Sequence, residues 1–271
     1  RELHTGVEGR DYLCPRPGPN ENSFRRCAIF AHLTEVAFDL AGMGDSEMRG
    51  EADPEARGRE FVEIAEALNL FADGHKPTIV AHSFGSGAAL TAVTQSPDHF
   101  SGLVICDLMV MRAELLEQYW NQRRSSPGSG DPDKPKRSYA SYEEARKRYV
   151  LSPPQPVGEP FLLDYMAYHS MRLDGDNWTW KFTPEVFRQS NKSEEWLTIG
   201  QRLVNTPGRK TIVHGAKSQL FTKDSADYIR ELGGGDIPII AVPEARHHLM
   251  LDQPLAFVTA LLSILHLWEN K

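Results

Sequence analysis

Short apolar runs alternate with amphipathic segments along most of this chain. The runs at residues 78–81 and 103–106 have the length and apolar character of buried strands. Upstream of them, Phe61, Ala65 and Leu68 fall at the spacing of one helix face. This alternation predicts a parallel sheet with helices on both of its faces. Further strands are expected at residues 36–40, 211–213 and 237–242, and further helices from residue 85 and at residues 254–265.

The alternation stops in the middle of the chain, where helical patterns follow one another without an intervening strand. Residues 124–137 are polar and rich in proline, glycine and serine, which is the composition of a loop. We therefore expect an α/β core formed by residues 1–107 and 209–271, with a helical lid subdomain formed by residues 108–208. The expected lid helices lie at residues 113–122, 142–149, 161–171 and 194–204.

The composition is that of an ordinary soluble globular protein, with 40% apolar and 25% charged residues among 271. A chain of this length buries a stable core without disulfides or metal ions. Its formal net charge of −7 argues against nucleic-acid binding, which requires a basic face. No segment has the apolar length of a membrane span, and the first residues do not resemble a signal peptide. We therefore expect a cytoplasmic protein with no nucleic-acid or membrane partner.

The three cysteines, Cys14, Cys27 and Cys106, form neither a CxxC pair nor the spacing of a metal site. Cys106 lies within an apolar run, where a small core residue is expected. We expect all three to be free thiols, which suits a reducing compartment. No metal site is predicted from this pattern.

The strongest chemical motif is Ala-His-Ser-Phe-Gly at residues 81–85, between an expected strand and an expected helix. It differs from the nucleophile elbow G-x-S-x-G only by Ala81 at the first small position. Such a turn needs small residues two positions either side of the serine, so that strand and helix can approach. The turn exposes the hydroxyl of Ser83, and the backbone N–H of Phe84 then points at a developing oxyanion.

A second motif, in residues 243–254, directly follows the last expected strand. It has the form P-x-A-x-H, with an acidic residue five positions and a proline seven positions after the histidine. Asp252 and Pro254 have this spacing from His247 and not from its neighbour His248. Asp252 also stands where it would cap the last helix, which is expected to begin near Pro254.

Together these motifs resemble those of the α/β-hydrolase family, in the family's order of serine before histidine. A third segment, D-x-x-G-x-G-x-S at residues 39–46, is similar to the strand-to-loop segment of that family. The resemblance covers residues 28–110 and 205–268. It implies an α/β-hydrolase fold in which Ser83 is the nucleophile and His247 is its base.

The acid of the catalytic triad departs from the family pattern. Members usually carry it as G-x-x-D after the penultimate strand, where it holds the histidine in the productive tautomer. Here that segment begins at Gly215 and has Ser218 in place of the acid. Some members place the acid after the strand that follows the nucleophile helix, where this chain has Asp107. We favour Asp107, with Asp224 as the alternative acid and a site without an acid as the third possibility.

The second departure lies upstream of the nucleophile. The family carries an HG-type loop whose backbone N–H is the second oxyanion donor. Residues 1–38 contain no His-Gly pair, and residues 5–27 do not match the family. Residues 30–34 are similar to the end of the helix that would follow such a loop. The second donor is therefore left open.

The resemblance implies a serine hydrolase that cleaves a small-molecule carboxylic ester or lactone through an acyl-enzyme, with no cofactor and no metal. A serine nucleophile argues against haloalkane dehalogenase and epoxide hydrolase chemistry, because the related enzymes use aspartate at that position. Hydrolysis of C–C bonds and cofactor-free oxygenation are alternatives on the same fold. A further alternative is a ligand-binding protein that has lost catalysis.

Overall fold

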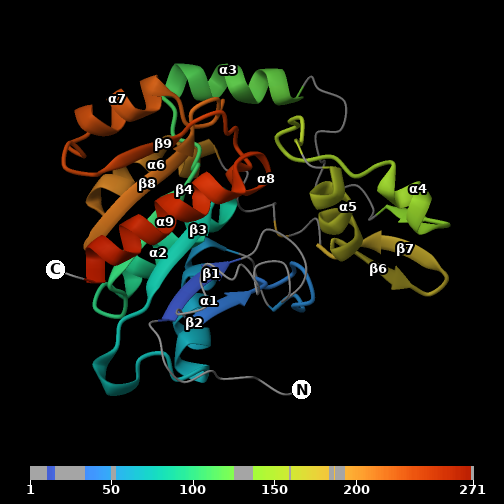
Figure 1. Ribbon diagram of the computed structural model, residues 1–271, viewed down its shortest axis with the longest axis horizontal. Helices are drawn as coiled ribbons and strands as arrows, with labels where there is room; N and C mark the ends of the chain where they lie inside the picture. Colours follow the sequence, from blue (N-terminus) through green and yellow to red (C-terminus); the bar gives the residue numbers. More distant parts are fainter. Residues whose placement is uncertain are drawn as a thin grey trace.

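The computed structural model describes residues 11–15, 34–49, 53–124, 137–158, 160–182, 186 and 193–269. Within these residues the centre of the molecule is a six-stranded sheet in the order β2-β1-β3-β4-β8-β9, and all neighbouring strands are parallel (Figure 1). Its strands are β1 (Asp11–Pro15), β2 (Thr34–Phe38), β3 (Thr78–His82), β4 (Gly102–Cys106), β8 (Arg209–Gly215) and β9 (Ile239–Val242). The predicted parallel sheet is confirmed.

Apolar side chains alternate between the two faces of this sheet. On one face Ile79, Leu103 and Ile212 belong to a core cluster shared with α1, α2, α6 and α7. On the other face Val104 and Val213 pack with α9, which crosses in front of the strands in Figure 1. These helices are α1 (Pro54–Ala67), α2 (Phe84–Gln95), α6 (Ser193–Asn205), α7 (Lys223–Glu231) and α9 (Pro254–Glu269), and a 3₁₀ turn, η2 (Ala72–Gly74), precedes β3.

The register of the central strands brings their carboxyl ends together. His82 at the end of β3 pairs with Cys106 at the end of β4, and Cys106 pairs with Val213 of β8. The residues that follow β3 and β4 are Ser83 and Asp107, which therefore emerge side by side at one edge of the sheet. Ligands of open α/β sheets bind at this edge.

Strand β1 was not predicted from the sequence. It lies between β2 and β3 and pairs with both, and its sequence is Asp-Tyr-Leu-Cys-Pro. The neighbouring strand β2 begins two residues before the predicted segment 36–40. The hydrophobic pattern missed β1 because its apolar run, residues 12–14, is shorter than the four residues that indicate a buried strand.

The inserted region contains strands as well as helices. A three-stranded antiparallel sheet, β5-β7-β6, lies beside α4 and α5, to the right of the main sheet in Figure 1. The sequence predicted helices in this region and did not predict these strands: the Trp-Thr-Trp run in β7 forms a hairpin with β6 across Gly175 (φ 62°). The elements of this region are α3 (Ala113–Arg124), β5 (Ser138–Tyr139), α4 (Tyr142–Arg146), α5 (Pro160–His169), β6 (Met171–Asp174) and β7 (Asn177–Trp180).

The division into core and lid stays a prediction, because the elements of the inserted region differ in what they contact. Aromatic and apolar side chains around Tyr139 and Trp178 form a separate small cluster. Helix α6, in contrast, packs against α2 and α7 of the core. Most of the predicted loop at 124–137 lies outside the described residues, as do the side chains of Cys14 and Cys27. Cys106 is a buried free thiol.

Asp252 does not cap the last helix as predicted. It belongs to a short helix, α8 (Leu249–Asp252), and its buried carboxylate accepts the backbone N–H of Arg246 at 2.7 Å. Asp252 therefore holds the loop that precedes α8, and it does not cap the start of α9. Among the described helices none combines the length and apolarity that crossing a membrane requires.

Candidate active site

Ser83 occupies the sharp turn between β3 and α2. Its backbone has φ 52° and ψ −121°, a conformation that non-glycine residues rarely adopt and that costs about 1–3 kcal/mol. The turn is held on both sides, because the N–H of Ser83 donates to the carbonyl of Cys106 at 2.9 Å and its carbonyl accepts from Ser86 at 2.9 Å. The predicted strained turn is thus present, and Ser83 stands at its apex.

Asp107 follows β4 and is fully buried, with a φ of 48°. Its carboxylate accepts three hydrogen bonds: from the N–H of Gly215 at 2.8 Å, from the hydroxyl of Ser218 at 2.6 Å and from Nδ1 of His247 at 2.8 Å. A buried carboxylate is costly unless donors surround it, and these three donors meet that requirement.

The contact with Asp107 determines the tautomer of His247. A carboxylate accepts, so Nδ1 carries the proton and Nε2 keeps a lone pair, as a general base requires. The ring is almost completely buried, at 2% exposure. Within the described part of the chain Nε2 has no hydrogen-bond partner, so the bond from Ser83 is not made in this conformation. Catalytic hydrogen bonds often tighten only when substrate binds.

Asp224, the alternative acid, lies elsewhere. It is in the first turn of α7, and its carboxylate accepts from the guanidinium of Arg112 at 3.2 Å. Arg112 also pairs with Glu231 at 2.7 Å and stacks on the ring of Tyr228. The structure therefore brings Asp107, and not Asp224, to His247.

The backbone of the loop that carries His247 is hydrogen-bonded at four successive residues. The carbonyl of residue 245 accepts from the N–H of Lys217, and the N–H of residue 246 donates to Asp252. The carbonyl of residue 247 bonds to Nε2 of His82, and the N–H of residue 248 donates to the side chain of Gln155. Gln155 belongs to the inserted region, which thus contacts the site.

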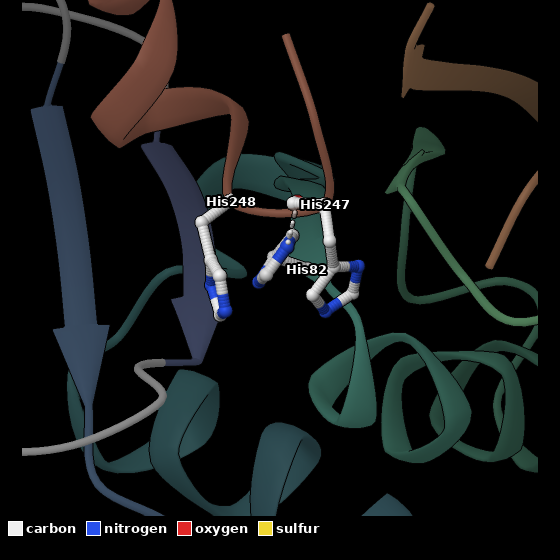
Figure 2. Close-up of side chains that lie close together, drawn as sticks. All are labelled: His82, His247 and His248. Carbon is white, nitrogen blue, oxygen red and sulfur yellow. Dashed lines mark hydrogen bonds between the residues drawn. The ribbon is translucent and has the colours of Figure 1, made fainter. Parts of the chain in front are cut away.

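His82 and His248 lie against His247. The centre of the His247 ring is 4.7 Å from that of His82 and 4.8 Å from that of His248, and Figure 2 shows all three rings projecting into the same space. Burial, with the nearby His247, lowers the pKa of His248 to about 3. The same causes lower the pKa of His82 well below its ordinary value. Both rings are therefore neutral near pH 7.

Phe84, whose backbone N–H is the predicted oxyanion donor, is the first residue of α2. Helix N-termini favour negative charge because of the helix dipole. The buried guanidinium of Arg57 lies 4.5 Å above the Phe84 ring and donates to the carbonyl of Val186. Burial lowers the pKa of Arg57. Sequence reasoning missed Arg57, whose contacts with Phe84 and Val186 join segments that are far apart in the chain.

The second oxyanion donor is not located. In the sheet β1 is parallel to β3, so the carboxyl end of β1 lies at the same edge as Ser83. That segment, residues 16–33, lies outside the described residues, and so does most of the predicted helix end at residues 30–34.

The site thus combines a half-buried serine at a strained turn, an imidazole with an unpaired Nε2, and a buried carboxylate that orients the imidazole. This arrangement can activate a hydroxyl for attack on an acyl carbon. The contribution of Ser218 was missed from the sequence, where it marked only the missing acid. Ser218 follows β8, and β8 lies beside β4, which Asp107 follows. This position in the expected strand order is the signal that could have indicated a contact between Ser218 and Asp107.

Comparisons with known proteins agree with this description. A family model described as the alpha/beta hydrolase family matches residues 23–261. Among solved structures, E-2-(acetamidomethylene)succinate hydrolase is similar with a TM-score of 0.73 and 16% identity, over 96% of this chain and 91% of that one. No curated protein sequence matches the chain.

Two further solved structures have a similar fold. The Mycobacterium tuberculosis esterase Rv0045c, studied for transition metal inhibition, has a TM-score of 0.69 at 18% identity, covering 96% of this chain and 86% of its own. The thioesterase domain from the curacin biosynthetic pathway has a TM-score of 0.68 at 15% identity, covering 94% and 92%. At these identities the likeness shows the fold.

Proposed function

The chain belongs to the alpha/beta hydrolase family, and from this premise we propose that it is a serine hydrolase that cleaves a carboxylic ester or lactone. Ser83 is the nucleophile, His247 the base and Asp107 the acid in this proposal. The observation that carries it is the 2.8 Å contact between Asp107 and His247, beside a serine held at a positive φ. The esterase and thioesterase folds among the similar structures support acyl transfer.

The reaction follows from the roles of the three side chains. Nε2 of His247 removes the proton of the Ser83 hydroxyl as the oxygen attacks the acyl carbon. The N–H of Phe84 stabilises the oxyanion, and Asp107 stabilises the imidazolium. His247 returns the proton to the leaving alcohol, and a water molecule then repeats the sequence on the acyl-enzyme. The reaction takes place without a cofactor.

A fluorophosphonate probe tests this proposal directly. We expect the wild-type protein to be labelled at Ser83 and to hydrolyse p-nitrophenyl esters, with both properties lost in Ser83→Ala. Removal of a triad member can reduce turnover by about 10⁶. Folding of the variant is checked by circular dichroism.

Each other outcome contradicts part of the proposal. A Ser83→Ala variant that keeps more than a few per cent of activity would show that the nucleophile is another residue. A wild-type protein that binds esters without labelling or turnover would be a ligand-binding protein. Labelling without hydrolysis of any ester or lactone would favour C–C bond hydrolysis on the same residues.

A further inference from the structure

Three ring nitrogens in the site are buried and have no hydrogen-bond partner among the described residues. They are Nδ1 of His82, Nε2 of His247 and Nε2 of His248. One ring nitrogen of each histidine lies within 4.8 Å of one nitrogen of each of the others. Figure 2 shows the three side chains close together. A buried polar atom without a partner costs about 1–3 kcal/mol, so three in one place need an explanation.

Two of these histidines use their other ring nitrogen in a hydrogen bond. Nε2 of His82 donates to the carbonyl of His247 at 2.8 Å, and Nδ1 of His247 donates to Asp107. The backbone of Pro153 lies close to the His248 ring, and a hydrogen bond between them opposes the lowering of the His248 pKa. In the neutral imidazole, Nδ1 of His82 and Nε2 of His247 therefore carry lone pairs, and Nε2 of His248 can carry one as well.

A partner for this cluster has to interact with three ring nitrogens at once. A water molecule has two O–H groups and leaves the third nitrogen unpaired. A metal ion accepts all three at once, and imidazole is a preferred ligand of Zn²⁺ and Cu²⁺.

We propose that His82, His247 and His248 bind a divalent transition metal ion of the Zn²⁺ type, with a water molecule as the fourth ligand. Three histidines and one open position are a known arrangement for Zn²⁺. With Zn–N distances of about 2.1 Å, ligand nitrogens in a tetrahedral site are about 3.4 Å apart. The three rings therefore approach one another by about an ångström, which small side-chain rotations provide.

Metal binding at this place has a consequence for catalysis, and this part rests on the proposed function. The ion occupies the lone pair on Nε2 of His247, with which the base would accept the proton of Ser83. The metal-bound protein is therefore inactive as a hydrolase, and removal of the ion by a chelator restores activity. The site is thus an inhibitory metal site.

The test measures binding separately from activity. Tag-free protein is stripped with a chelator, desalted and titrated with Zn²⁺ by isothermal titration calorimetry. The variants are His248→Gln and His82→Gln, each of which removes one ligand, and Ser83→Ala. The matched control is His99→Gln, because His99 is half-buried and its Nδ1 also has no partner, but its ring contacts Phe71 and Phe100.

We expect one Zn²⁺ per chain, with micromolar or tighter affinity, in the wild type, Ser83→Ala and His99→Gln. Loss of one ligand should weaken binding by about tenfold or more, since even outer partners of metal ligands contribute that much. Ester hydrolysis by the wild type should fall with the same midpoint as binding and return with chelator. In His248→Gln the inhibition midpoint should rise in parallel with the Kd.

Three results would overturn the proposal: no such binding to the wild type, unchanged affinity in folded ligand variants, or an equal loss in His99→Gln. Full activity at saturating Zn²⁺ would overturn the inhibitory role. If the protein binds Zn²⁺ through these histidines but hydrolyses no ester, the metal site is supported and the proposed function is contradicted. Thermal unfolding confirms that each variant is folded, and two separate ligand variants keep the test decisive if one is not.

Discussion

The hydroxyl of Ser218 donates a 2.6 Å hydrogen bond to Oδ1 of Asp107, the same oxygen that accepts Nδ1 of His247. The hydroxyl also accepts from the N–H of Leu220 at 3.1 Å, so its proton is directed at the carboxylate. Ser218 thus stands where the family motif has an acid, and its hydroxyl instead orients Asp107, which follows the adjacent strand. Ser218 is a positioning residue in this arrangement.

Replacing Ser218 by alanine should therefore lower kcat for ester hydrolysis by roughly tenfold, which corresponds to about 1.4 kcal/mol of transition-state stabilisation. KM should change little, because Ser218 acts through Asp107 and not on the substrate. The reduced hydrogen bonding of a buried carboxylate should also lower stability by about 1–3 kcal/mol. Steady-state kinetics and urea denaturation measure the two effects.

The control for Ser218 is Ser225→Ala. Ser225 is also buried, but it completes the capping box of α7 with Thr222 and does not contact Asp107. We expect this variant to lose stability by about 1 kcal/mol and to keep its kcat. Equal kcat in the two variants would mean that Ser218 contributes only to folding.

Asp107→Asn and Asp224→Asn should differ strongly. Asparagine at 107 keeps the shape but permits the wrong tautomer of His247, a change that lowers turnover by about 10⁴ in a well-studied triad. Asparagine at 224 weakens a partly exposed pair with Arg112, far from His247, and should have little effect on kcat. Kinetics on one ester settle the comparison. A near-normal Asp107→Asn variant contradicts the assignment, and two near-normal variants indicate a Ser–His dyad.

His247→Ala should be inactive, whereas His248→Ala should be weakened but working. Only His247 contacts Asp107, and His248 instead packs beside the base. We expect turnover to fall by about 10⁴ or more in the first variant and by less than about tenfold in the second. Both are assayed with a chelator present, so that trace metal does not confound the comparison. Equal losses in two folded variants would remove the basis for assigning the base.

Gly58 and Gly87 offer a matched pair for stability. A Cβ at Gly58 would lie 2.7 Å from the side chains of Thr91 and Gln95, whereas a Cβ at Gly87 meets nothing within 4 Å. Gly58→Ala should destabilise by about 1–3 kcal/mol because α1 and α2 are forced apart. Gly87→Ala should stabilise by up to about 1 kcal/mol through helix propensity. Urea denaturation measures both, and a neutral Gly58→Ala would show that the helices adjust.

Local patterns predicted most of the central sheet and its helices. The turn at Ser83 and the loop at His247 could be placed because their signals lie within a dozen residues of sequence. Strand β1 and the β6–β7 hairpin were not predicted, since short apolar runs give little pattern and short strands are stabilised by pairing with their neighbours. A role for Ser218 could not be predicted either, because its partner is 111 residues away.

The histidine neighbours show the same limit. His82 and His248 are far apart in sequence. They come together because the loop after β9 lies beside the end of β3 in the fold. The prediction that Asp252 caps the last helix was wrong for a related reason. Its carboxylate instead accepts the backbone N–H of Arg246, six residues upstream. Residue spacing identifies elements that obey local rules, whereas contacts between elements decide which side chains share a site.

The four backbone hydrogen bonds along residues 245–248 restrict how this site can move. Lys217, Asp252, His82 and Gln155 each hold one residue of the loop, so the main chain has no loose segment there. Reorganisation of the imidazole of His247 towards Ser83 is therefore a change of side-chain torsion angles. Rotamer changes take picoseconds to nanoseconds where side chains are free and are slower in packed surroundings, whereas loop rearrangements can take microseconds. Proton transfer at this serine should consequently not wait for a movement of the loop that carries the base.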